Sequence, residues 1–348
     1  ISSADHREDM SLIKEIGANG IRLAHYPHSD EFYTLCDREG MLVWAEIPLV
    51  GKALDTPEFT ENMKTELTEL IRQNFNHPSI FCWSLCNELS KGDVKGLISE
   101  LNDVSHREDP GRLTVLAANV EKRPENAVPD IMAFNTYPGW YWAEPSEMKS
   151  TLERWNRQCG NKGIAVSEYG AGANVWHHWQ TGKKTPKADG VFHPEEWQAT
   201  VHEQTYDAIK RSGFAWGSFV WNMFDFASAS RNEGDMPGMN DKGLVSYDRK
   251  IRKDAFYFYQ SEWSEEPVVH IASRRDVARR DSLTDVKVYT NCETVRLKVN
   301  GKDCGSPERN GSICIWRKVG LKYGENQVEA FGQRGGQEFS DRCKWVLF

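Results

Sequence analysis

The sequence predicts a barrel of parallel strands with helices outside, followed by a small all-β sandwich. Over residues 1–265, short apolar runs alternate with segments of helical period, which is typical of parallel strands covered by helices. From about Pro267, runs of period-two alternation replace the helical period, and Asn300-Gly301 is a hairpin turn signal between two of them. We therefore expect a barrel domain over 1–265 and an immunoglobulin-like sandwich over 266–348.

Seven apolar runs predict the strands of the barrel. A helical pattern over 5–16, closed by Gly17, precedes the first run, and Ser29 and Thr56-Pro57 predict the N-termini of two further helices. A helix followed by seven strand–helix units is what a (β/α)8 TIM barrel looks like without its first strand. We therefore expect that strand to be missing and the chain to be cut from a longer one. The predicted strands are 20–24, 41–46, 79–86, 113–118, 131–135, 164–167 and 215–222.

The composition excludes several classes of function. The net charge of −8 does not suit a broad nucleic-acid-binding face, and no apolar run approaches the ~20 residues of a membrane span. The eight cysteines lack the paired spacing of a zinc site. We therefore expect no nucleic acid, no membrane, no metal and no cofactor. Whether the four cysteines of the sandwich form disulfides stays open.

Two glutamates stand at the ends of predicted strands. Glu88 follows the run 79–86, and Glu168 follows the run 164–167. In a parallel barrel, catalytic side chains lie where the strands end, so both are candidates for chemistry rather than solvated loop acids.

Barrel geometry predicts how far apart the two carboxyl groups lie. If a first strand is missing, the two glutamates stand on strands four and seven of eight. A backbone radius of roughly 7.7 Å then separates these strands by roughly 14 Å. Two glutamate side chains that reach inward leave roughly 5 Å between their carboxyl groups, the spacing of a retaining rather than an inverting glycosidase.

Six motifs cover the barrel: NGIRLAHYP at 19–27, FYTLCDREG at 32–40, NHPSIFCWSLCNE at 76–88, SEYG at 167–170, KGLVSYDRK at 242–250 and AFYFYQ at 255–260. In these motifs and in their order the chain resembles glycoside hydrolase family 2, the family of β-galactosidases, β-glucuronidases and β-mannosidases. The first two resemble the family's first signature, the third its acid/base signature and the fourth its nucleophile strand. The last two resemble the stretch after the last strand.

The resemblance implies a role for each matching residue. Glu88 is the expected general acid/base, and Glu168 is the expected nucleophile of a double displacement. Arg22 and Tyr137 are expected to hold Glu168 charged, because opposite charge and hydrogen bonds stabilise a carboxylate. The remaining expected sugar contacts are Asn87 at the 2-hydroxyl, His25 in the sugar subsite and Trp221 as a stacking floor followed by a cis peptide bond.

The resemblance specifies the type of reaction more closely than the sugar that the enzyme acts on. The stretch 240–245 is most like that of β-galactosidases, so we expect an exo-acting β-galactosidase for terminal sugars. A β-glucuronidase is the alternative, because Asn240-x-Lys242 has the spacing with which those enzymes bind the sugar carboxylate. Some family members hold magnesium after the third strand, but the stretch after Glu46 lacks their acid–x–His pattern.

A rival from another class is a non-catalytic carbohydrate-binding fragment, because the chain lacks the β-domains that usually precede this barrel. The intact pair of glutamates favours the enzyme. The partner we expect is a carbohydrate substrate, and the resemblance allows a homo-oligomer formed through N-terminal domains outside this chain. The compartment stays open, with a periplasmic or secreted location favoured over the cytoplasm.

Overall fold

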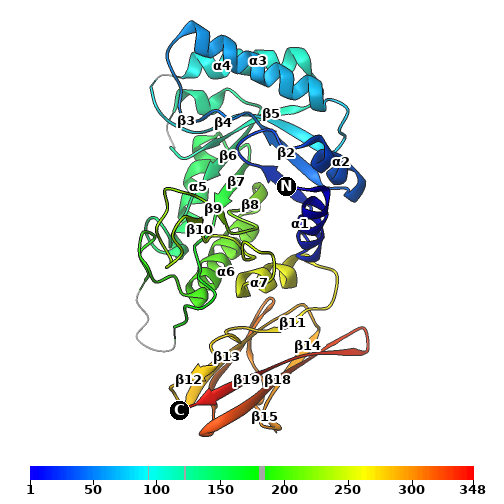
Figure 1. The fold of residues 1–348 in the computed structure, drawn as a ribbon, viewed down its shortest axis with the longest axis vertical. Helices are drawn as coiled ribbons and strands as arrows, with labels where there is room; N and C mark the ends of the chain where they lie inside the picture. The colour runs from blue at the N-terminus through cyan, green and yellow to red at the C-terminus, as the bar shows by residue number, and fades with distance from the viewer. Residues whose placement is uncertain (93, 121–122, 180–184) are drawn as a thin grey trace.

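The structure is a computed structural model that describes residues 1–92, 94–120, 123–179 and 185–348. Its upper part in Figure 1 is a sheet of parallel strands with helices outside it, and its lower part is built of β-strands. Helix α7 (Asp254–Trp263) leads from the upper part to β11 (Val269–Ile271), the first strand of the lower part. This is the predicted fold class.

The barrel sheet consists of parallel strands that pair in chain order. The path runs β1-β2-β4-β5-β6-β7-β8, and the short β3 pairs beside β4. Because every pair in this sheet is parallel, the carboxyl ends of all strands meet at one end of the barrel. The strands are β1 (Gly20–Leu23), β2 (Leu42–Glu46), β3 (Val50–Lys52), β4 (Ile80–Lys91), β5 (Leu113–Ala118), β6 (Ile131–Asn135), β7 (Ile164–Tyr169) and β8 (Ala215–Val220).

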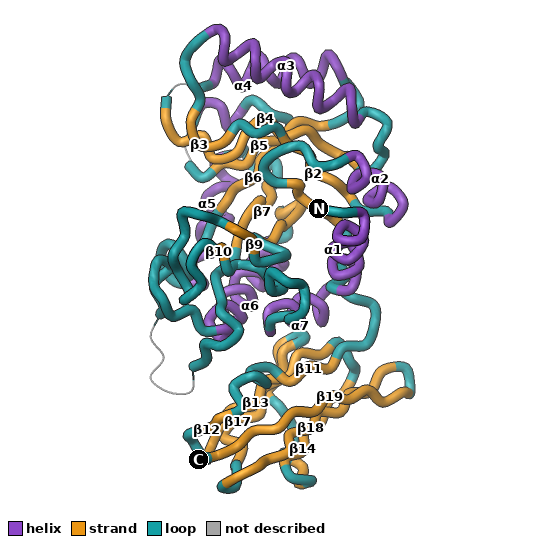
Figure 2. Tube along the Cα trace, in the orientation of Figure 1, coloured by secondary structure: helices purple, strands orange, loops and turns teal. Residues whose placement is uncertain are grey.

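The helices lie outside this sheet, as Figure 2 shows. The Thr56 hydroxyl accepts a hydrogen bond from the Phe59 amide and Pro57 follows it, which explains the start of α3. Ser29 also precedes a helix, but its hydroxyl contacts His6 instead of capping the helix, so the predicted side-chain cap is wrong there. The barrel helices are α1 (Ser3–Glu15), α2 (Asp30–Glu39), α3 (Pro57–Asn74), α4 (Lys95–Glu108), η1 (Pro124–Ala127), η2 (Pro145–Glu147), α5 (Met148–Gln158), α6 (Glu195–Ser212) and α7.

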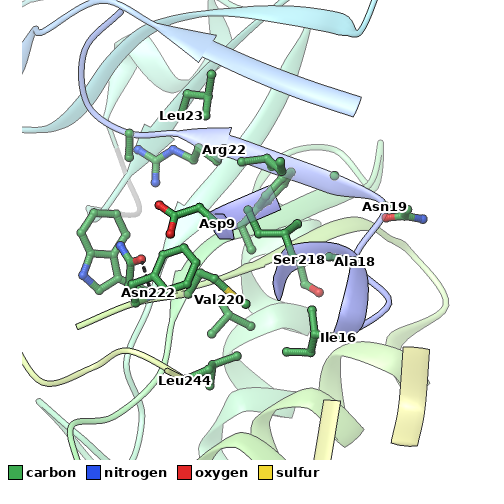
Figure 3. Close-up of a pocket in the computed structure, with 18 of the residues that line it drawn as sticks. Asp9, Ile16, Ala18, Asn19, Arg22, Leu23, Ser218, Val220, Asn222 and Leu244 are labelled. Carbon is green, nitrogen blue, oxygen red and sulfur yellow. Dashed lines mark hydrogen bonds between the residues drawn. The ribbon is translucent and has the colours of Figure 1, made fainter. Parts of the chain in front are cut away.

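The barrel is open along one seam. Among the described residues, no backbone pairing joins β1 to β8. A cavity of about 580 Å³ lies along this seam, and Figure 3 shows Ile16, which follows α1, Arg22 of β1 and Ser218 of β8 around it. The cavity also reaches Trp221, so it connects the seam with the carboxyl ends of the strands.

The lower part is a sandwich of two sheets. One sheet has the order β11-β13-β17-β16 and the other β12-β19-β18-β14-β15. Val286 and Val288 of one sheet and Leu297 and Val328 of the other are buried in a shared core, as period-two alternation predicts. Its further strands are β12 (Ala278–Arg279), β13 (Leu283–Thr290), β14 (Thr294–Val299), β15 (Lys302–Asp303), β16 (Glu308–Asn310), β17 (Ile313–Gly320), β18 (Gly324–Arg334) and β19 (Gln337–Leu347).

All eight cysteines are free thiols in the structure. None of the helices in the described part of the chain combines the length and apolar character needed to cross a membrane.

Candidate active site

The carboxyl ends of β1, β6 and β7 bring three predicted site residues together. Glu168, near the end of β7, is almost fully buried. Its Oε1 accepts a hydrogen bond of 2.7 Å from Arg22 Nη1, and its Oε2 accepts one of 2.6 Å from the Tyr137 hydroxyl. Both carboxylate oxygens are thus held by donors from the carboxyl ends of other strands, which fixes the orientation of a candidate nucleophile.

Glu88 has a different environment. It belongs to β4 with a φ of 52°, in the left-handed region that non-glycine residues rarely adopt outside functional or strained sites. Its Oε1 accepts a hydrogen bond of 2.7 Å from Asn135 Nδ2, and among the described residues no cation lies within ion-pair distance. Burial raises the pKa of Glu88, and the charge of Glu168 raises it further against the opposing Asn135 bond. A carboxyl group of this kind suits a general acid.

Asn87 and Asn135 connect the two glutamates. The amide oxygen of Asn87 accepts from Arg22 Nη2 at 2.8 Å and from Asn135 Nδ2 at 3.1 Å, and Asn135 in turn accepts from the Ser167 hydroxyl. Two donors fix which end of the Asn87 amide is the oxygen, so its NH2 group is left as the donor for a ligand. Sequence reasoning missed the role of Asn135, although it ends a predicted strand.

His25 and Trp221 form a stacked pair. Their ring centroids lie 5.1 Å apart with an interplanar angle of 15°, and Phe226 meets the Trp221 ring edge-on. One face of Trp221 is therefore covered by His25. The Trp221–Asn222 peptide bond is cis, as predicted, and the Ala24–His25 bond is cis as well.

Glu46, at the end of β2, is a buried carboxylate that sequence reasoning left without a role. Its oxygens lie within hydrogen-bond distance of Arg22, His25 and Trp44. Burial alone would raise the pKa of Glu46, but the Arg22 charge and the His25 hydrogen bond outweigh it and hold the pKa below its usual value. The signal was present in the sequence, because Glu46 ends a strand just as Glu88 and Glu168 do.

Asn240 ends β10 (Met239–Asn240), which pairs with β9 (Phe226–Ala227), and Lys242 follows this pair of strands. The Lys242 ammonium lies 5.5 Å from the ring centroid of Trp140 and 5.3 Å from that of Tyr141. Tyr141 contacts Tyr137, which binds Glu168, so Lys242 belongs to the same end of the barrel. Asn240 points its amide oxygen at the Lys242 amide nitrogen, at 3.1 Å, so it shapes the turn.

The Lys242 ammonium has few partners for a buried charge. The side chain is 1% exposed, and its nearest carboxylate oxygen, on Glu233, lies 3.5 Å away. Glu233 in turn accepts a 2.7 Å bond from Arg231. A lysine ammonium has three donors, and among the described residues Glu233 is its one hydrogen-bond acceptor, so the ammonium can form further bonds to an anionic ligand.

A second buried lysine supports the loop that carries Lys242. Lys253 Nζ donates to the carbonyl oxygens of Ala173 and Asp241 and to Asp225 Oδ1, all within 2.8 Å. Asp241 also contacts His193 at 2.6 Å. Lys253 thus has three acceptors within 2.8 Å, whereas the described residues give Lys242 one acceptor, at 3.5 Å. Within the described ranges, no group of three or more histidine, cysteine, aspartate or glutamate side chains is arranged to hold a metal ion.

Comparison with known proteins gives the same picture for the barrel. Residues 1–265 match the family described as glycosyl hydrolases family 2, TIM barrel domain. Residues 281–340 match a domain of unknown function.

Individual relatives carry two different names. A β-glucuronidase of Bacteroides fragilis is 43% identical over 93% of this chain and 48% of its own length. A crystal structure of a Bacteroides fragilis protein provisionally named a β-galactosidase is 34% identical, with a TM-score of 0.94 over all of this chain and 52% of that one. Bacteroides uniformis β-glucuronidase 2, covalently bound to cyclophellitol-6-carboxylate aziridine, is 30% identical, with a TM-score of 0.89 over all of this chain and 44% of that one. The chain thus spans about half the length of these relatives.

Proposed function

The chain belongs to glycoside hydrolase family 2, and on that premise we propose that the protein is a retaining β-glucuronidase acting on terminal β-linked glucuronides. The family and the names of the relatives support an O-glycosyl hydrolase of the β-glycosidase type. The activity, the retaining mechanism, the residue roles and the choice of sugar are the proposal.

In the first step, Glu168 attacks the anomeric carbon while the bond to the leaving oxygen breaks. Glu88 gives its proton to that oxygen, so the leaving group departs as an alcohol. Arg22 and Tyr137 hold the attacking carboxylate in place through their hydrogen bonds. The NH2 group of Asn87 is the donor for the sugar 2-hydroxyl.

In the second step, Glu88 takes a proton from water while the water oxygen attacks the anomeric carbon and releases Glu168. The change of role has a physical cause, because the charge of Glu168 is one of the factors that raise the pKa of Glu88. Once Glu168 is an uncharged ester, that contribution disappears and Glu88 ionises more readily.

The buried Lys242 ammonium is the observation that carries the choice of sugar. A galactoside has no charge to place beside it, whereas a glucuronide has a carboxylate that can accept hydrogen bonds from the ammonium. Because Lys242 is 1% exposed, binding requires Tyr141 or the ammonium to move. The names of most relatives reported above agree, so the expected galactoside preference is less well supported than the glucuronide alternative.

The test compares p-nitrophenyl β-D-glucuronide with p-nitrophenyl β-D-galactoside in the wild type and in Lys242→Met. A charge-assisted hydrogen bond contributes about 1.5–3 kcal/mol, so kcat/KM on the glucuronide should fall about 10- to 100-fold. Any activity on the galactoside should change little. A wild type that prefers the galactoside, or a variant that loses both activities equally, would contradict the proposal.

A further inference from the structure

Glu46 is surrounded by hydrogen-bond donors although it lies outside the proposed chemistry. It is 1% exposed. Its Oε2 accepts from Arg22 Nε and from Trp44 Nε1, each at 3.0 Å. Its Oε1 lies 3.0 Å from Arg22 Nη2 and 2.7 Å from His25 Nδ1. Each oxygen therefore has two partners, and the carboxylate has little capacity left for a ligand.

These contacts determine where the proton on His25 lies. An ionised carboxylate only accepts hydrogen bonds, so a distance of 2.7 Å to Oε1 requires a proton on His25 Nδ1. Arg22 Nη2 lies 3.3 Å from the same nitrogen. Both atoms are donors once Nδ1 is protonated, so no hydrogen bond forms between them. The other ring nitrogen, Nε2, lies 3.7 Å from Glu168 Oε1.

We propose that Glu46 is a positioning residue with two roles. It holds His25 in the Nδ1-protonated form, so that His25 Nε2 faces the nucleophile, and it anchors Arg22, which binds Glu168. In the neutral Nδ1–H tautomer, Nε2 is an acceptor for a sugar hydroxyl and donates nothing to Glu168. The Glu168 carboxylate is then not engaged in a hydrogen bond from His25 and remains available to attack the anomeric carbon. The inference rests on the proposed function for the role of Glu168, but the protonation of His25 is measurable without any substrate.

The second part concerns Arg22, whose donors are divided between two carboxylates. Arg22 is almost fully buried, and although burial lowers its pKa, Glu46 and Glu168 together raise it. Nε and Nη2 bind Glu46, while Nη1 binds Glu168. Two contacts to Glu46 fix the plane of the guanidinium, so its contact to Glu168 has a defined direction.

The first experiment uses the wild type alone. Nitrogen-15 NMR of protein labelled at histidine distinguishes the two ring nitrogens, and the substitution His25→Gln assigns the His25 signals. The expected result is a protonated Nδ1. A neutral ring with the proton on Nε2 would overturn the proposal, whether or not any variant folds.

The second experiment replaces Glu46 by glutamine. The amide NH2 cannot replace Oε2, because Arg22 Nε and Trp44 Nε1 both donate there, so it must face His25 and Arg22 Nη2. His25 then accepts through Nδ1 and carries its proton on Nε2, which lies 3.7 Å from Glu168 Oε1, so the proton stands beside the nucleophile. We expect the NMR signals to show His25 protonated on Nε2 instead of Nδ1. We also expect kcat/KM to fall about 100-fold, which is the cost of a misplaced catalytic group.

Glu46→Asp is the matched control, because it keeps the charge and shortens the side chain by one methylene. It should keep Nδ1 protonated and recover much of the rate that Glu46→Gln loses. An unchanged tautomer in Glu46→Gln, or a switched tautomer with full activity, would refute the positioning role. Failure of the proposed function is a separate outcome, in which Glu168→Gln stays active while the His25 signals follow the expectation.

Discussion

Buried carboxylates occur in two regions of this molecule, and their partners differ. At the carboxyl ends of the barrel strands, Glu88 has an asparagine as its partner, and its pKa is raised. At the interface between barrel and sandwich, Glu195 of α6 is bound by Arg275, and Asp254 of α7 lies 2.9 Å from His270. The Asp254 carboxylate also accepts from the Ser273 amide at 2.6 Å.

The difference shows what each region is built for. Arg275, His270 and Ser273 belong to the sandwich, so the interface charges are paired across the two parts of the chain and hold them together. In the described part of the chain no cation pairs with Glu88, which costs stability but provides a proton that can be transferred. Changes at the first region should therefore alter the rate, and changes at the second should alter stability.

The largest expected effect is that of Glu88→Gln. General acid–base catalysis contributes about 10²–10⁴-fold, so kcat/KM should fall by that range on an unactivated glucuronide and less on one with a good leaving group. In the wild type, glycosyl-enzyme formation needs protonated Glu88. The rate should thus fall as pH rises through its raised pKa, and this alkaline limb should vanish in the variant. A pH profile that keeps the limb would assign it to another group.

A smaller effect is expected for Tyr137→Phe. The variant keeps the ring but removes the 2.6 Å hydrogen bond to Glu168, which should lower kcat/KM about 10- to 100-fold. Tyr141→Phe is the control, because its hydroxyl has only a 3.5 Å contact with Arg231 and should matter far less. Equal losses in the two variants would mean that the hydrogen bond to the nucleophile is not the cause.

The smallest effect on rate is expected at the interface, where Arg275→Met removes the cation bound to Glu195. An unpaired buried carboxylate costs about 3 kcal/mol, so the free energy of unfolding should drop by that amount while kcat/KM stays unchanged. Arg317→Met is the control, because Arg317 pairs with Asp285 on the exposed surface of the sandwich, where the loss should stay below about 1 kcal/mol. A drop in kcat/KM at intact stability would show that the two regions are coupled.

Much of the barrel follows from the sequence because its strands are buried and continuous. The runs at 113–118 and 131–135 coincide with β5 and β6. The run at 79–86 predicts only the first half of β4, because the strand continues through polar residues to Lys91, where β3 pairs with it. In the sandwich, edge strands such as β15 and β16 are exposed on both faces and show no alternation to detect.

A site residue was predictable from the sequence where its own type and position were sufficient evidence. Glu88 and Glu168 were identified because each is an acid at the end of a strand. Glu46 satisfies the same rule, but its partner Arg22 lies 24 residues away and the partnership exists only after β1 and β2 pair. The environment of Lys242 likewise depends on Trp140 and Tyr141, which the sequence separates from it by about a hundred residues.

The measurement that tests the account most directly is covalent trapping of the nucleophile. The protein is incubated with 2-deoxy-2-fluoro-β-D-glucuronyl fluoride, which slows release of the glycosyl-enzyme, and the labelled peptide is identified by mass spectrometry. We predict one fluoroglucuronyl group on Glu168 in the wild type and none in Glu168→Gln. A label on another residue, or no adduct under conditions in which the wild type hydrolyses glucuronides, would contradict the account.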